Sequence, residues 1–109
     1  MPSWHAGEWE GKSLGRDVAK TLQGSDGKFK LSAKDVMPLI ENNRSLKSLA
    51  EAEIDSQSGV STFANHVVEL FEGNGGNRMN KSEATELLED IGKQVCGLLY
   101  GEKFSKENT

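Results

Sequence analysis

The strongest constraint on this chain is a run of apolar residues at helical spacing in its last third. These residues recur every three or four positions over about four turns, as Ala84, Leu87, Leu88, Ile91, Val95, Leu98 and Leu99. A stripe of this period is typical of an amphipathic helix that buries one face. We expect the helix to end near Gly101 and a charged tail to follow over residues 102–109.

Shorter stripes of the same kind predict three further helices. One covers residues 13–22, a second begins between residues 32 and 36, and a third follows Ser61, which is expected to cap it. With the last helix, these make four main helices. Segments with the alternating pattern of strands are nearly absent, so the sequence predicts an all-α fold.

The middle of the chain leaves two points open. The second helix starts at Ser32 if this residue forms a capping box with Asp35. If Asp35 is itself the cap, Pro38 falls in the first turn, where proline costs little. Residues 45–54 carry a weaker stripe and form either an extra linker helix or an extended hinge.

The composition limits the class of protein. A chain of 109 residues has room for one domain, which we place at residues 13–101. The net charge of −4 argues against nucleic-acid binding, and no stretch has the length and hydrophobicity of a membrane span. Cys96 is the only cysteine, which favours a reducing, intracellular compartment.

Residues 1–12 are expected to form an irregular N-terminal arm. Gly7 and Gly11 are interpreted as helix breaks, and the arm carries two aromatic side chains, Trp4 and Trp9. These tryptophans either pack onto the domain or bind a partner.

Two loops in the chain share one layout. Each follows an amphipathic helix and ends in one apolar residue, a short polar cap and the next helix. The apolar residue is Leu31 in the first loop and Met79 in the second, and Asp35 and Glu83 follow as carboxylates. This is the arrangement of a paired EF-hand, in which a carboxylate at the twelfth loop position binds calcium. The two apolar residues are expected to face each other across a short two-stranded contact.

The segment GSDGKFKLSAKD at residues 24–35 resembles the first loop of the calcyclin and calgranulin group of small dimeric EF-hand proteins. The resemblance implies an enlarged loop over residues 22–35 that takes calcium mainly through backbone carbonyls. The implied ligands are four carbonyls and one carboxylate, from Leu22, Ser25, Gly27, Lys30 and Asp35. Asp35 replaces the family's Glu and is one methylene shorter. At superfamily level the resemblance covers residues 13–43 and 61–100.

The second loop resembles the usual twelve-residue EF-hand loop. Its implied calcium ligands are four side chains and the carbonyl of Arg78, with the side chains supplied by Glu72, Asn74, Asn80 and Glu83. The loop departs from the family because Gly76 has no side chain to offer and Asn77 stands where a left-handed glycine is usual. With only two carboxylates, it is predicted to bind calcium weakly, or to be a degenerate loop that only pairs helices.

The apolar residues of the second and last helices suggest a binding surface. The candidate partner-binding residues are Met37, Ile40, Leu98, Leu99 and Tyr100. They line a groove for an amphipathic helix or a second copy of the chain, or else they all belong to the core. No arrangement typical of catalysis is present. The sequence therefore predicts a non-enzymatic interaction module, acting as a weak calcium sensor or a calcium-independent adaptor. The alternative is a structural subunit of a larger assembly with metal-free loops.

Overall fold

The two longest helices of the protein pack against each other in antiparallel orientation. The structure is a computed structural model, which describes the backbone of residues 3–108 and the side chains of residues 9–98. The helices of the described chain are, in order, α1 (Ser3–Ala19), α2 (Ala33–Glu41), α3 (Arg44–Glu53), α4 (Gly59–Gly73), the short 3₁₀ helix η1 (Gly76–Arg78) and α5 (Lys81–Asn108). The predicted all-α class is confirmed, and the described chain has no strand beyond one isolated bridge between Gln23 and Lys30.

Helices α1 and α5 approach so closely that their contact is made by glycines. A Cβ added to Gly15 would lie 2.2 Å from the carbonyl oxygen of Leu88, and one added to Gly92 would lie 2.0 Å from that of Gly11. Side-chain contacts are ordinarily 3.4 Å or longer. The ion pair between Arg16 and Glu89 links the two helices beside this contact.

The predicted irregular arm over residues 1–12 is wrong for the described part of that segment, because α1 already begins at Ser3. The glycines that suggested helix breaks are spaced four residues apart, so they lie on one face of α1. That face packs on α5, and burial against a partner helix outweighs the low helix propensity of glycine, about 1 kcal/mol per residue. The predicted tail is likewise helical, since α5 continues to Asn108.

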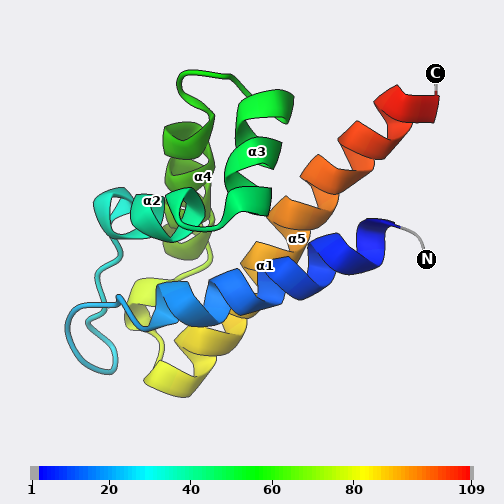
Figure 1. The fold of residues 1–109 in the computed structure, drawn as a ribbon. Helices are drawn as coiled ribbons and strands as arrows, with labels where there is room; N and C mark the ends of the chain where they lie inside the picture. The colour runs from blue at the N-terminus through cyan, green and yellow to red at the C-terminus, as the bar shows by residue number, and fades with distance from the viewer. Residues whose placement is uncertain (1–2, 109) are drawn as a thin grey trace.

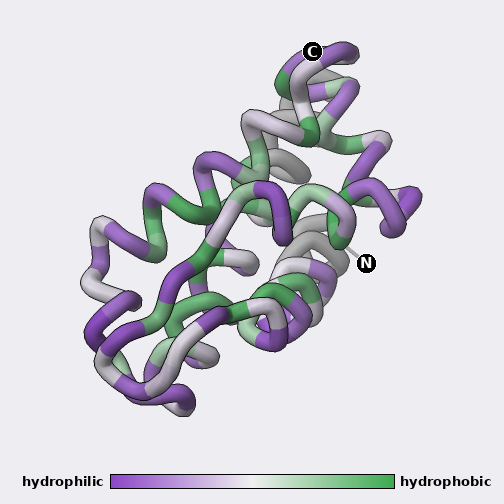
Figure 2. Tube along the Cα trace, turned by 90° about the vertical axis from the view of Figure 1, so that its left-hand side faces the viewer, coloured by the Kyte–Doolittle hydropathy of each residue, from purple (hydrophilic) through white to green (hydrophobic). Residues whose placement is uncertain are grey.

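Helices α2, α3 and α4 lie together on one side of the α1–α5 pair, and the two termini lie at the same end of the molecule (Figure 1). Hydrophobic and hydrophilic residues alternate along the helices (Figure 2). The apolar faces meet in one core, whose largest fully buried side chains are Phe63, Phe71, Ile40, Leu46 and Leu88. Burial of this apolar surface is the main force that holds such helices together.

Residues 45–54, for which the sequence allowed either a helix or a hinge, lie mainly in helix α3. Its N-cap is Asn43, whose side-chain oxygen accepts a hydrogen bond of 3.1 Å from the N–H of Leu46. The buried face of α3 carries Leu46, Leu49 and Ala50. A side-chain cap and an apolar face together specify a helix here.

Two helix starts differ from the expectations in detail. Helix α4 begins at Gly59 rather than at Ser61, because the Asp55 carboxylate accepts hydrogen bonds from the N–H groups of Gln57 and Ser58 and folds the connection earlier. Helix α2 has Ser32 as its N-cap, with no side-chain cap bond, and Pro38 lies inside the helix.

None of the described helices is long and apolar enough to cross a membrane.

Candidate functional site

The two candidate calcium loops lie side by side and are joined by backbone hydrogen bonds. The N–H of Gly27 donates to the carbonyl of Met79, and the N–H of Phe29 donates to that of Asn77, both at 2.9 Å. The side-chain amide of Asn77 also donates to the carbonyl of Phe29 at 2.9 Å. We call this set of contacts the loop junction.

The register of the loop junction differs from the prediction. Met79 lies opposite Gly27 rather than opposite Leu31. Leu31 is only 4% exposed and belongs to the core, against which Met79 also packs. The first loop closes before it, through paired backbone bonds between Gln23 and Lys30.

Two predicted ligands of the second loop cap helix α5. The side-chain oxygen of Asn80 accepts from the N–H of Glu83 at 2.8 Å, and the Glu83 carboxylate accepts from the N–H of Asn80 at 3.3 Å. This reciprocal pair is a capping box, which satisfies N–H groups that have no partner within the helix. Residues expected to hold an ion therefore stabilise the start of α5.

The other ligand positions of the second loop are also altered. Glu72 lies within α4, and the side-chain amide of Asn74 donates to the carbonyl of Leu70 at 2.7 Å at the end of that helix. Arg78 ends the 3₁₀ helix η1, and its N–H donates to the carbonyl of Gly75.

The fifth position of this loop cannot carry a side chain. A Cβ added to Gly76 would lie 2.3 Å from the ring of Phe71, which is fully buried. Asn77 does not adopt the left-handed conformation that is usual at its position in an EF-hand loop. Gly75 adopts it instead, with φ of 76°, and every residue with a positive φ in the described chain is a glycine. The backbone thus turns at a different residue from the one that an EF-hand loop uses.

Two of the predicted carbonyl ligands of the first loop accept hydrogen bonds within the protein. The carbonyl of Ser25 accepts from the N–H of Lys28 at 2.8 Å, and that of Lys30 accepts from the N–H of Gln23 at 3.1 Å. The side chain of Leu22 packs against the core, and Gly27 takes part in the loop junction through its N–H. The Asp35 carboxylate accepts a long bond of 3.4 Å from the Gln23 side chain.

The ligands of a calcium ion are oxygens that converge on one point at 2.3–2.6 Å. In the second loop the side-chain oxygens of Asn80 and Glu83 accept cap bonds from the backbone. Among the described residues, no three His, Cys, Asp or Glu side chains gather as a metal-binding group.

Sequence reasoning missed two residues beside the loop junction, Asp26 and Lys81. The Asp26 carboxylate accepts from the backbone N–H of Lys81 at 2.9 Å. The Lys81 ammonium donates to the carbonyl of Ala19 at 2.8 Å and lies 5.7 Å from the centre of the Phe29 ring. A lysine at the first position of a helix opposes the helix dipole, and this was the available signal that its side chain serves another element.

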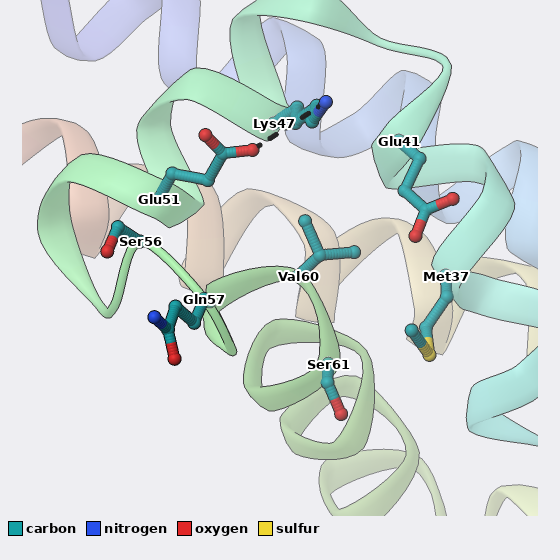
Figure 3. Close-up of a pocket in the computed structure, with 9 residues that line it drawn as sticks. Met37, Glu41, Lys47, Glu51, Ser56, Gln57, Val60 and Ser61 are labelled. Carbon is teal, nitrogen blue, oxygen red and sulfur yellow. Dashed lines mark ion pairs between the residues drawn. The ribbon is translucent and has the colours of Figure 1, made fainter.

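A groove lies between helices α2, α3 and the start of α4, with a volume of about 410 Å³. Met37 and Val60 supply its apolar surface, while Glu41 and the Lys47–Glu51 ion pair stand at its edge (Figure 3). Of the predicted partner-binding residues whose side chains are described, Met37 alone lines it.

Two other predicted partner-binding residues with described side chains, Ile40 and Leu98, do not line this groove. Ile40 is fully buried and belongs to the core, so a partner cannot reach it. Leu98 is 61% exposed on α5, whose C-terminal part lies at the opposite end of the molecule from α2 (Figure 1). The side chains of Leu99 and Tyr100 lie outside those described.

Trp9 and Cys96 have opposite environments. Trp9 is 75% exposed and does not pack onto the core, whereas the side chain of Trp4 lies outside those described. Cys96 is fully buried, and burial, together with the negative charge of Glu10, raises the pKa of its thiol to about 12. A thiol that stays protonated and enclosed does not suit nucleophilic chemistry.

No protein-family model, curated protein or solved structure matches this chain in the comparisons.

Proposed function

We propose that this protein is a non-enzymatic interaction module built from two EF-hand-like helix–loop–helix units, and that it works without calcium. The observation that carries the proposal is the capping box between Asn80 and Glu83, which engages both predicted side-chain ligands in the second half of the second loop. The side-chain amide of Asn74 donates to the end of α4, and the ring of Phe71 leaves no room for a side chain at Gly76. Because a cation would first have to break the bonds that the Asn80 and Glu83 oxygens make to the backbone, the loop gains little from binding one.

The groove between α2, α3 and α4 supports the interaction role. Met37 and Val60 would receive an apolar side chain of a partner segment, and the exposed carboxylate of Glu41 favours a partner with a basic residue beside that anchor. An amphipathic helix with one apolar and one basic face meets both requirements. The buried cysteine also fits the reducing, intracellular compartment that we propose for this chain.

Calorimetric titration with calcium tests the proposal. We expect no binding heat up to millimolar calcium at low ionic strength. A saturable heat that disappears in Glu83→Gln would identify the second loop as a working calcium site and overturn the calcium-independent reading. A saturable heat that persists in Glu83→Gln would contradict it equally, and would point to the first loop.

A structural subunit of a larger assembly is the second candidate, and the exposure of Trp9 favours it. An indole that is 75% exposed on a helix is a common anchor of protein interfaces. Native mass spectrometry tests whether the chain assembles with itself through Trp9. If it does, the parent chain is an oligomer and the Trp9→Ser variant is a monomer. A monomer for both chains would remove self-assembly through this residue.

A further inference from the structure

Lys81 connects the start of α5 to residues that lie 55 and 62 positions earlier in the sequence. Its backbone N–H bonds to Asp26, its ammonium bonds to the carbonyl of Ala19, and its ammonium faces the ring of Phe29. These partners belong to the end of α1 and to the first loop, while Lys81 itself is the first residue of α5. One residue therefore fastens the end of one helix to the start of another.

The charges at this point match the ends of both helices. The carbonyls at the C-terminal end of α1 carry partial negative charge, and the Lys81 ammonium satisfies one of them at 2.8 Å. The N–H groups at the start of α5 carry partial positive charge, and the Asp26 carboxylate lies there at 2.9 Å. The ring of Phe29 adds a face on which a cation is attracted.

The loop junction lies directly beside Lys81. Met79, two residues before it, accepts from Gly27, and Asn77 accepts from Phe29. Asp26 directly precedes Gly27, and Phe29 itself makes one of these bonds. Any movement of Lys81 away from Ala19 and Asp26 must therefore strain the backbone bonds that join the loops.

We propose that the Lys81 ammonium is a built-in cation that holds the two loops together, in the role that a bound metal ion has in calcium-dependent loops. The inference rests on the proposed function, in which the loops close without metal. Loss of this one charge opens the loop junction and leaves the helical core assembled. Lys81 is thus the point at which the pairing of the two loops is controlled.

Site-resolved amide hydrogen exchange of Lys81→Met tests the proposal. Methionine keeps most of the apolar stem and removes the charge. We expect the amides of Gly27 and Phe29 to exchange about tenfold faster, the size of effect that follows from loss of one charge-assisted hydrogen bond. Lys28→Met is the matched control, since Lys28 is exposed in the same loop, loses the same charge and makes no side-chain contact among the interactions of the described residues. It should leave both rates unchanged.

A second control separates the loop junction from overall stability. Ile40→Val removes one buried methylene of the core in α2, away from the loops, and lowers global stability without touching Lys81. If Lys81→Met accelerates Gly27 and Phe29 no more than Ile40→Val or Lys28→Met does, the proposal is overturned. Calcium binding by the unmodified chain would remove the proposed function, whereas unchanged exchange in Lys81→Met would remove this inference alone.

Discussion

Replacement of Gly92 by alanine should separate the two longest helices. The new Cβ would lie 2.0 Å from the carbonyl oxygen of Gly11 and 3.3 Å from the backbone nitrogen of Gly15. Because the obstructing atoms are backbone, relief requires α1 and α5 to move apart by about an ångström or more. A gap of that size forfeits roughly a quarter to a half of the van der Waals attraction along the contact.

The magnitude follows from two opposing effects. Overpacking of this kind costs about 1–3 kcal/mol, and more where backbone must shift, while alanine in a helix returns about 1 kcal/mol. We expect a net loss of about 2 kcal/mol in the free energy of unfolding, because three backbone atoms within 3.5 Å oppose the new methyl group and place the cost at the top of that range. In thermal unfolding followed by circular dichroism, this corresponds to a midpoint lower by roughly 8–16 °C.

Gly97 provides a matched control in the same helix. A Cβ at Gly97 would meet no atom of the described residues within 4 Å, so Gly97→Ala should stabilise the protein by about 0.5–1 kcal/mol through helix propensity alone. The reasoning would be refuted if Gly92→Ala stayed within about 0.5 kcal/mol of the parent chain, or if both variants lost stability equally.

Two further predictions concern capping and titration. Asn43→Ala should lower the free energy of unfolding, measured in urea, by about 1 kcal/mol because α3 loses its side-chain cap. Ser48→Ala, on the exposed face of the same helix, should leave the free energy of unfolding unchanged. Equal losses in the two variants would contradict the capping role. The pKa of the Cys96 thiol is about 12 in the folded protein, above its ordinary value of 9.0. Its preference for the protonated form therefore stabilises the fold fully below pH 9, and this contribution to the free energy of unfolding falls between pH 9 and about 12. Cys96→Ala should remove this decline, and a thiol reagent should label the parent chain only when it unfolds; rapid labelling under native conditions would show that the thiol is accessible.

Much of the helical framework follows from apolar periodicity. The stripe that predicted the last helix contains Ala84, Leu88, Ile91 and Val95, all of which are buried. The exception is α1, whose glycines at four-residue spacing signal close helix packing as well as they signal a break. Whether such glycines break a helix or pack it closely depends on the presence of a partner helix. Here the partner is α5, about 75 residues further along the chain.

The candidate site was harder to predict, because one side chain can satisfy either an ion or the backbone. Asn80 and Glu83 occupy positions that suit both a calcium loop and a capping box, and their spacing is the same in each case. In the sequence, Gly76 appears as a position that lacks a calcium ligand. In the structure, the ring of Phe71 occupies the space that a side chain at this position would need. The role of Lys81 depends on the end of a helix 62 residues earlier, which no local pattern contains.

The central claim is that the two loops close on their own hydrogen bonds, without a metal ion. An amide-resolved NMR spectrum of the chain in excess chelator, followed by addition of about 10 mM calcium, well above the 10⁻⁴–10⁻³ M range of weak sites, tests it most directly. The account predicts dispersed, protected amides of Gly27, Phe29 and Glu83 in chelator and no shift of these signals with calcium. Unprotected loop amides in chelator that become ordered as calcium is added would contradict it.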